Sequence, residues 1–504
     1  MFLFCSLDAH LKVMNKILLT AVLTGMLVNA AAQKKPLPEI ARVVTKSETE
    51  AHLRFLASDE LRGRDTGSPE LDIAAAYIAS EFSRWGVKKV AGANDYYQPV
   101  ALEKKKYAST VDITVGDLTL KNKEDLILLE GSNLTWEGDA VFVGYGSEAD
   151  MQQANVKGKW VVSYIGASAN SNIQQAFGES DEKVKRAKQL GAVGLTEIVA
   201  TPGVPWQILV NFLTRESIAL KGDEPTSLPH LMMRNSDAAA VKAFIESKTG
   251  RLKVTLVQAA GEPLPGKNVL GIIPGTDPKL KNEYVALTAH YDHVGIGRAV
   301  SGDSIYNGTR DNAIGTTAVL QAARYFAANP PKRSILVMTV TAEEKGLLGS
   351  RWFADHPLIP LKQIIFNLNC DGAGYNDTTR VTLFDVNRTS ADEMLKSAAA
   401  SVGATLNGDP APEQGLYDRS DNVSFAAKGV PAVTFTTGFN AFDNEIMKYY
   451  HQPADHVSNV NLNYVNRFVR AFVYAALLIA NNPAPPAWKP GDKYEAAGKA
   501  LYGR

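Results

Sequence analysis

The sequence predicts an α/β protein whose mixed, mainly parallel central sheet is flanked by helices, with a smaller β-rich domain inserted into the chain. From residue 267 onward, compact apolar runs alternate with helix-like stretches, which is typical of a sheet with a parallel centre. Between residues 105 and 262, short strand-like runs predominate, and one helix-like stretch lies among them. The chain has 504 residues, more than a single hydrophobic core usually serves, so two domains are expected.

The first 32 residues are typical of a secretory signal peptide rather than of folded structure. Lys16 precedes the apolar run ILLTAVLTGMLV, and Ala30, Ala31 and Ala32 supply the small residues of a cleavage site. A membrane anchor is the weaker interpretation, because the apolar run is short and ends in small residues. We therefore expect an exported protein, periplasmic or secreted, with no stable membrane insertion once residues 1–32 are removed.

The rest of the chain divides into four predicted segments. Residues 33–120 form the N-terminal part of the larger domain, 121–262 the inserted domain, 263–484 the remainder of the larger domain, and 485–504 a loose, Pro-rich C-terminal tail. Within the first of these, apolar residues at 71, 75, 78, 82 and 85 mark one face of a helix that ends near Gly86.

The composition excludes several classes of function. Lys and Arg together number 53, as do Asp and Glu, so the formal net charge is zero and there is no basic excess to bind nucleic acid. The only cysteine outside the expected signal peptide is Cys370, which we interpret as a core residue of its strand, so the mature chain has no internal disulfide. The motifs HExxH, GxSxG and GxxxxGK[ST] are all absent.

Histidine and carboxylate side chains follow three of the buried runs. YVALTAH ends at His290, SILVMTV is followed by Glu343 and Glu344, and IIFNLNC is followed by Asp371. Open α/β sheets bind ligands beyond the carboxyl ends of their strands. We therefore expect these side chains to meet at one edge of the sheet.

Two loops add a further carboxylate and imidazole, Asp311 in NGTRDNAIG and His451 in YYHQPADH. Two imidazoles and three carboxylates suit a pair of Zn²⁺ ions, with one carboxylate bridging them. Asp292 lies two residues after His290, on the same side of an extended strand, where it can accept a hydrogen bond from the other imidazole nitrogen. Alternatives remain for single residues: Asp311 also suits an N-cap of the following helix, and His451 an ordinary loop histidine.

The adjacent glutamates are expected to have different roles, because successive strand residues point in opposite directions. Glu344 can bind metal while Glu343 faces the water between the metals, takes its proton and later passes that proton to a leaving amine. A solvent-exposed pair is the alternative, and the metal interpretation rests on the conjunction of five ligand-type residues in one domain. His293 and His456, beside these motifs, are interpreted as structural or supporting residues.

These motifs together resemble peptidase family M28, zinc peptidases of the aminopeptidase Y/S type. The matching segments are AHYDH (289–293), NGTRDNAIGTTA (307–318), TAEEKGLLGS (341–350), NLNCDG (367–372), RSDNVSFAAKGVPAV (419–433) and YHQPADH (450–456). Residues 53–82 resemble the segment that precedes an inserted protease-associated (PA) domain in that family, and the inserted domain contains PA-like runs such as AVFVGYG.

The resemblance implies a role for each matching residue. It implies that Glu343 is the general base, that Asp292 orients His290, and that Tyr450 polarises the substrate carbonyl, although Tyr450 also suits a half-buried packing role. The implied metal ligands are His290, Asp311 as the bridge, Glu344, Asp371 and His451.

Three residues depart from the family pattern. Arg310 and Ile314 stand where Asp and Ser are frequent, and Asn422 stands where a His is common. None of these departures removes a ligand, so they bear on substrate preference and not on the reaction.

The resemblance implies a zinc-dependent aminopeptidase that hydrolyses N-terminal residues from peptides through a water bridging two Zn²⁺ ions. A carboxypeptidase of the same family is an alternative, with Arg310 and Arg419 as candidate groups for a C-terminal carboxylate. A glutaminyl cyclase-like acyltransferase would use a single zinc, and a catalytically silent, receptor-like relative would have lost ligands. The preferred N-terminal residue, the role of the inserted domain and the oligomeric state are not predicted.

Overall fold

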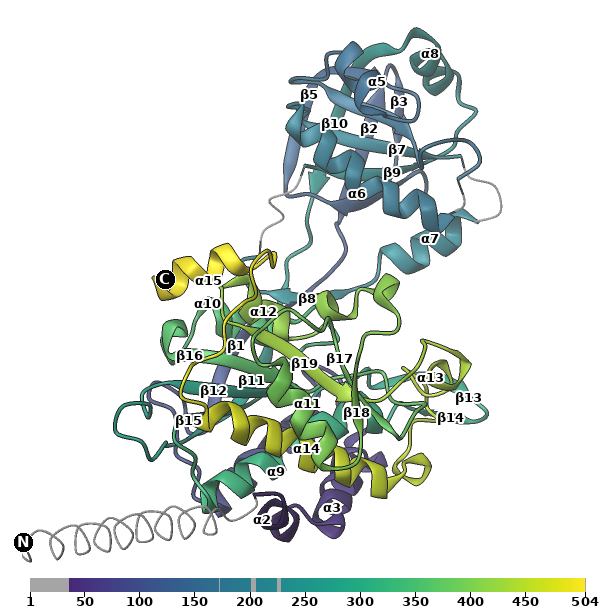
Figure 1. Ribbon diagram of the computed structural model, residues 1–504. Coiled ribbons are helices and arrows are strands. Elements are labelled where there is room, and N and C mark those ends of the chain that lie inside the picture. The colour runs from purple at the N-terminus through teal and green to yellow at the C-terminus, as the bar shows by residue number, and fades with distance from the viewer. Residues whose placement is uncertain (1–35, 172, 201–204, 224–227, 504) are drawn as a thin grey trace, which may run out of the picture. The chain divides into compact units, whose positions relative to one another are not determined.

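Two segments far apart in the sequence build one α/β unit. The computed structural model describes residues 36–171, 173–200, 205–223 and 228–503, so the expected signal peptide lies outside the described residues (Figure 1). The first unit combines the residues up to Pro99 with Lys267–Arg504, and the second comprises Val100–Gly266. The chain leaves the first unit along β1 (Tyr97–Lys105) and returns along β11 (Glu262–Ile273).

The sheet of the first unit has a parallel centre and antiparallel neighbours. β12 pairs in parallel with β15 and β16, and β16 pairs in parallel with β19, whereas β11 and β17 run antiparallel to their neighbours β15 and β19. This arrangement confirms the predicted mixed, mainly parallel sheet. The strand order is β18 (Thr405–Gly408), β17 (Arg380–Leu383), β19 (Ala432–Thr437), β16 (Ile364–Asn369), β12 (Tyr284–His290), β15 (Ser334–Val340) and β11.

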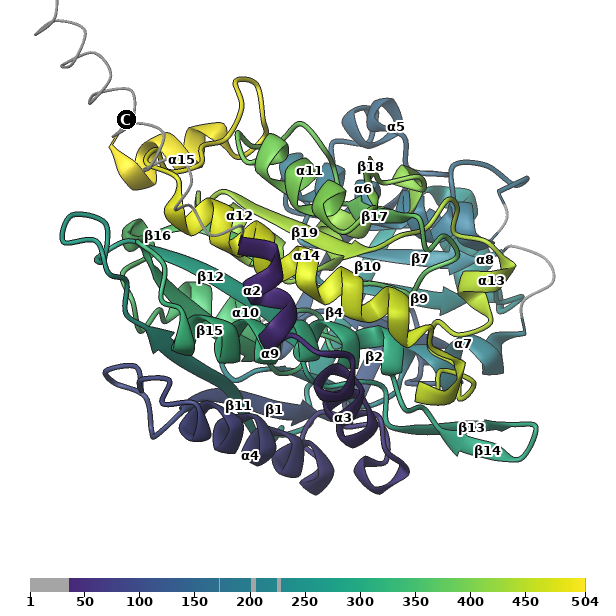
Figure 2. The same cartoon turned by 60° about the horizontal axis from the view of Figure 1, so that its bottom comes forward.

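Helices cover both faces of this sheet, so its central strands are apolar throughout. Val285, Leu287 and Ala289 of β12 pack into one core with helices on one face, while Ala286 packs into a second core on the other. Figure 2 is turned toward the first of these faces, where α2, α9 and α14 lie over the strands. The helices of the first core are α2 (Pro36–Val43), α3 (Lys46–Leu56), α4 (Pro69–Arg84), α9 (Ile314–Ala328), α11 (Asp392–Ser401) and α14 (Leu462–Asn481).

The second core contains side chains of two short helices and of the C-terminal segment. These helices are α10 (Leu348–Asp355) and α12 (Asn422–Ala427), and a further short helix, α13 (Asn444–Met447), lies in a loop of the same unit. The amphipathic helix predicted around residues 71–85 is α4, whose Leu71, Ala75, Ile78 and Phe82 are buried. Among the described residues, no helix combines the length and the apolar character needed to span a membrane.

The second unit is built around its own sheet of eight strands. Its order is β3 (Leu118–Leu120), β2 (Thr110–Val115), β10 (Thr249–Val257), β5 (Leu134–Phe142), β6 (Trp160–Tyr164), β7 (Gly194–Val199), β9 (His230–Arg234) and β4 (Leu126–Glu130). The helices among its described residues are α5 (Glu148–Gln153), α6 (Ile173–Gln189), α7 (Trp206–Leu213) and α8 (Ala239–Ser247). A short strand, β8 (Ser217–Leu220), pairs antiparallel with Leu102–Lys105 of β1.

The second unit begins at Val100, earlier than the residue 121 chosen from the sequence. The reason is strand pairing, because β2 and β3 precede residue 121 and β2 pairs antiparallel with β10 of this unit. The unit is rich in strands, as expected, and its PA-like character stays a prediction.

The C-terminal segment differs from the loose tail expected for residues 485–504. It contains α15 (Glu495–Tyr502), and the Trp488 side chain is buried with its indole N–H donating to the carbonyl of Gly429 at 3.0 Å. Arg388 pairs with Asp492 at 2.8 Å, which fixes the segment at a second point. The Pro-rich segment is therefore part of the first unit.

We expect Trp488→Ala to lower the free energy of unfolding by about 3–5 kcal/mol, because it removes a buried indole and leaves a cavity. Urea unfolding followed by circular dichroism measures this change. Ile73→Ala removes a side chain that is 52% exposed in the same unit, and should change stability by less than about 1 kcal/mol. Equal effects of the two substitutions would show that the segment is not part of the core.

Candidate metal centre

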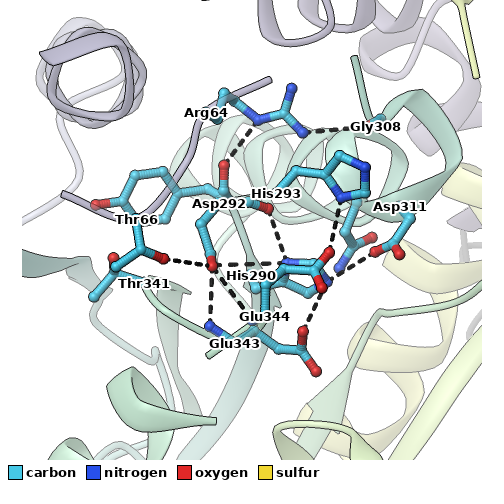
Figure 3. Close-up of polar contacts among 12 residues, drawn as sticks. Arg64, Thr66, His290, Asp292, His293, Gly308, Asp311, Thr341, Glu343 and Glu344 are labelled. Atoms are coloured by element: carbon cyan, nitrogen blue, oxygen red, sulfur yellow. Dashed lines mark hydrogen bonds and ion pairs between the residues drawn. The ribbon is translucent and has the colours of Figure 1, made fainter. Parts of the chain in front are cut away.

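The predicted ligands lie together at the carboxyl edge of the first unit's sheet. Figure 3 shows three of them, His290, Asp311 and Glu344. His290 is the last residue of β12, Glu343 and Glu344 lie just beyond β15, and Asp371 lies just beyond β16. Parallel pairing of β12 with both neighbours puts these strand ends side by side, as the sequence predicted.

One half of the site is formed by His290, Asp311 and Asp371. The Nε2 atom of His290 lies 3.0 Å from Asp371 Oδ1 and 3.2 Å from Asp311 Oδ1. One ligand atom from each of the three residues falls within 4.8 Å of the others, so a single cation can contact all three. All three residues are buried.

The other half is formed by Asp311, Glu344 and His451. The Nε2 atom of His451 lies 3.1 Å from Asp311 Oδ2 and 3.2 Å from Glu344 Oε2. Asp311 therefore presents one oxygen to each half, which is the geometry of a bridging carboxylate. Its alternative role as a helix cap is not seen, because the side chain of Asn312 accepts the bond from the backbone N–H of Gly315.

The two glutamates diverge because the backbone turns, and not because a strand alternates. β15 ends at Val340, and Ala342 has the left-handed φ of +57°. The backbone N–H groups of Glu343 and Glu344 donate to Oδ1 and Oδ2 of Asp292 at 3.1 and 3.3 Å. In this turn Glu344 reaches His451, while Glu343 Oε2 lies 3.9 Å from His290 Nε2.

Asp292 orients His290 through its backbone and not mainly through its carboxylate. The Nδ1 atom of His290 lies 3.1 Å from the carbonyl oxygen of Asp292, against 3.8 Å from Oδ1. A proton on Nδ1 directs the lone pair of Nε2 toward the acids. The carboxylate instead accepts from Thr66 Oγ1 at 3.1 Å and from the two glutamate N–H groups, so it supports the Glu343–Glu344 turn.

Acids and imidazoles in this cluster shift one another's pKa in opposite directions. Burial opposes the charged form of Asp311, yet hydrogen bonds to His290 and His451 hold its pKa well below the usual range. Burial likewise opposes protonation of His451, but its bonds to Asp311 and Glu344 raise its pKa to about 10. The carboxylates thus stay ionised and require positive charge from neighbouring groups.

Glu343 behaves differently from Glu344. Burial raises the pKa of Glu343 well above its usual range, and His290 only partly offsets that rise. For Glu344, burial is outweighed by bonds to His293 and His451, which lower its pKa to about 2. Glu343 therefore holds a proton readily, which suits a group that carries a proton. Glu344 stays ionised, which suits a metal ligand.

The donor set fits divalent cations of the zinc type. Imidazole nitrogens and carboxylate oxygens are ordinary Zn²⁺ ligands, and each half offers at least three of them. A buried cluster of carboxylates needs compensating positive charge, which bound divalent cations can supply.

His293, interpreted from the sequence as a structural or supporting residue, contacts a predicted ligand. Its Nδ1 lies 2.8 Å from Glu344 Oε1, and its ring groups with Asp311, Glu344 and His451 as a possible ligand. The ring packs against Gly308, where an added Cβ would lie 2.5 Å from it, so this turn requires glycine. The signal was present in AHYDH as a second histidine three residues after the first.

Arg64 is the functional residue that the sequence analysis missed. Its guanidinium is buried and donates to the carbonyls of Tyr291 at 2.9 Å, Asn307 at 2.7 Å and Gly308 at 3.1 Å, and also to that of Leu56. It thereby joins the loop after β12 to the turn before Asp311 (Figure 3). No spacing rule points to it, because its partners are backbone carbonyls.

Tyr450 lies beside the second half of the site. Its ring stacks on that of His451 with centroids 4.2 Å apart, and its hydroxyl oxygen accepts from Arg419 Nη2 at 3.1 Å. Burial raises the pKa of Tyr450, so the hydroxyl keeps its proton. Cys370 is buried next to Asp371 and acts as a core residue, as predicted.

Comparison with known proteins identifies the family. Residues 268–476 match the profile of Peptidase family M28. The aminopeptidase YwaD of Bacillus subtilis is 28% identical over 255 residues, which cover 47% of this chain and 50% of YwaD. A vacuolar membrane protease of Pyricularia oryzae is 37% identical over 120 residues, which cover 23% of this chain and 10% of that protein. The chain thus spans half or less of the length of these relatives.

A solved structure shares the fold. The aminopeptidase from Aneurinibacillus sp. strain AM-1 superposes with a TM-score of 0.54 at 21% identity, covering 90% of this chain and 98% of that one. Residues 268–476 therefore match the peptidase domain of family M28, in agreement with the resemblance found in the sequence.

We expect Arg64→Ala to lower the free energy of unfolding by about 3 kcal/mol or more, because it strips a buried donor from several backbone carbonyls. Arg64→Lys should lower the free energy of unfolding by less than Arg64→Ala does, but it should still destabilise the protein. One ammonium group cannot replace the several donors of a guanidinium. Chemical denaturation checks both. The control is Arg54→Ala on α3, where the side chain is 65% exposed and the effect should stay below about 0.5 kcal/mol. Equal losses at positions 54 and 64 would contradict the role of Arg64.

Proposed function

We propose that the protein is a zinc-dependent aminopeptidase that hydrolyses N-terminal residues from peptides. The observation that carries the proposal is the position of Asp311, whose two carboxylate oxygens lie 3.2 and 3.1 Å from the imidazoles of His290 and His451. A carboxylate shared in this way suits two cations held a few ångströms apart, as in two-metal hydrolases.

The proposed ligands divide between two Zn²⁺ ions. His290, Asp371 and Asp311 would hold the first, and Glu344, His451 and the shared Asp311 would hold the second. When bound, the pair of ions supplies polarisation of the scissile carbonyl and a lower pKa for the attacking water. His293 holds the outer oxygen of Glu344, so Glu344 keeps its other oxygen directed at the site.

Glu343 is the proposed general base. Its side chain is 12% exposed and reaches the first half of the site without a hydrogen bond to His290. Glu343 accepts the proton of the attacking water and then delivers it to the leaving amine, which its burial-raised pKa favours. Its N–H bond to Asp292 fixes the turn from which it reaches the water.

Tyr450 is proposed to bind the substrate carbonyl oxygen. Arg419 already donates to the tyrosine oxygen, so the hydroxyl proton is available for a second partner. Stacking of the ring on His451, which puts Tyr450 next to a proposed ligand, supports this role. A hydrogen bond there stabilises the negative charge that develops on the carbonyl oxygen during attack.

The other functions fit the site less well. Of the two candidates for binding a C-terminal carboxylate, Arg310 has a side chain only 4% exposed and is paired with Asp455, which argues against that role for Arg310. Arg419 is exposed and donates to Tyr450, so the substrate panel below decides between the aminopeptidase and a carboxypeptidase. A glutaminyl cyclase-like enzyme with a single zinc ion would need only one half of the site, and a catalytically silent relative would need neither. This chain has the candidate ligands of both halves. Export after cleavage of residues 1–32 and a PA-like identity for the second unit complete the proposal.

A substrate panel tests the proposed reaction. We expect the purified protein to release the N-terminal residue from a peptide with a free amino terminus and from one with a blocked carboxyl terminus. A peptide with a blocked amino terminus should remain intact, and an N-terminal glutamine peptide should not cyclise faster than without enzyme. Mass spectrometry of the products distinguishes these results. Cleavage from the carboxyl end or enzymatic cyclisation would overturn the aminopeptidase.

We expect Glu343→Gln to lower kcat by at least ~10²–10⁴-fold, because the amide cannot take a proton from water. The variant should still contain about two zinc ions per chain by elemental analysis, since Glu343 is not a proposed ligand. Glu393→Gln makes the same change on a side chain that is 83% exposed and should leave both quantities unchanged. Near wild-type hydrolysis of an aminoacyl anilide by Glu343→Gln would rule out its role.

A further inference from the structure

A buried ion pair joins the two loops that carry Asp311 and His451. Arg310 Nη1 donates to Asp455 Oδ1 at 2.8 Å, and the backbone N–H of Arg310 donates to Asp455 Oδ2 at 2.8 Å. The two side chains are only 4% and 2% exposed. Arg310 immediately precedes Asp311, so this contact acts next to the carboxylate that the two halves of the site share.

Further contacts fix the same two loops. Thr309 Oγ1 donates to the carbonyl of Asp455 at 2.7 Å, and Arg310 Nη2 donates to the carbonyl of Asn459 at 2.7 Å. The guanidinium also lies 3.7 Å from the ring centroid of Tyr449. Arg310 therefore holds the His451 loop on both sides of the histidine, at Tyr449 and at Asp455.

The two histidines of the site are supported very differently. His290 ends a buried strand, and its side chain is 1% exposed. His451 lies in a loop, its side chain is 35% exposed, and its backbone has the left-handed φ of +51°. A residue with a Cβ in that conformation costs about 1–2 kcal/mol, so surrounding contacts must hold it there.

We propose that Arg310 is a positioning residue that holds His451 at binding distance from Asp311, and so sets the zinc affinity of the half-site formed by Asp311, Glu344 and His451. The proposal rests on the metal centre of the proposed function. It assigns a role to a residue that departs from the family pattern. An arginine suits this role because its planar fork binds a carboxylate and a carbonyl at once while its face stacks on an aromatic ring.

Electrostatics and geometry make opposite predictions for loss of this arginine. Removing a positive charge next to ionised carboxylates should, by Coulomb's law alone, strengthen the binding of a cation. Releasing the His451 loop should weaken it. The sign of the change therefore separates a positioning role from a mere charge effect.

The test is a Zn²⁺ titration of metal-free protein by calorimetry. The wild type should bind about two ions per chain. In Arg310→Gln, one ion should bind with unchanged affinity and the other about 10–100-fold more weakly, as is usual when support for a ligand is lost. Asp455→Asn should cause the same selective loss of zinc affinity through a nearly isosteric substitution. Circular dichroism verifies that each variant is folded.

The chain offers a matched control in Arg388, which pairs with Asp492 at 2.8 Å and lies 3.9 Å from the ring centroid of Tyr417. Arg388→Gln should lower the melting temperature and leave both zinc affinities unchanged. The positioning role would be overturned if, in Arg310→Gln and Asp455→Asn, both zinc affinities were unchanged, both fell equally or either rose. The proposed function would still stand in these cases. A wild type that binds no zinc would overturn both.

Discussion

The structure depends on placing ionised carboxylates close together in a buried volume. Imidazoles lie within about 3 Å of Asp311, Glu344 and Asp371, and their hydrogen bonds lower the pKa of Asp311 and of Glu344, a role that divalent cations can take over. Parallel pairing of β12, β15 and β16 brings three strand ends to this point without bending the sheet. Like charges repel, so the loops at this edge need firm support. Buried donors from Arg64 and the acceptor carboxylate of Asp292 provide it.

The sequence predicted that the candidate ligands lie together because their positions follow from a simple rule. Apolar runs that end in His290 or precede Asp371 are recognisable as buried strands, and parallel strands place their ends at a common edge. The divergence of Glu343 and Glu344 was also predicted, but for the wrong reason. Strand alternation does not apply beyond Val340, and a left-handed residue at 342 together with bonds to Asp292 separates them instead. A backbone turn held by a distant carboxylate leaves no local pattern in the sequence.

Residues that act through backbone partners were the ones that the sequence could not reveal. Arg64 bonds to carbonyls, which every residue has, so nothing in the partner sequence marks the contact. The carbonyl of Asp292 receives the His290 bond for the same reason. The burial of Trp488 was likewise hidden, because a Pro-rich composition describes a chain without saying what it packs against. The start of the second unit depends on pairing between β2 and β10, which are far apart in the sequence.

The two halves of the site therefore differ in how the fold supports them. His290 and Asp371 belong to the sheet edge, whose geometry is set by backbone hydrogen bonds and a packed core. His451 and Tyr450 belong to a loop that side-chain contacts of Arg310 with Asp455 and Tyr449 join to the segment of Asp311. A substrate must enter from the side of the site that is exposed to solvent. The side chain of His451, which is 35% exposed, lies on that side. An arginine anchor there supplies rigidity without covering the opening, because it holds the loop from its buried face.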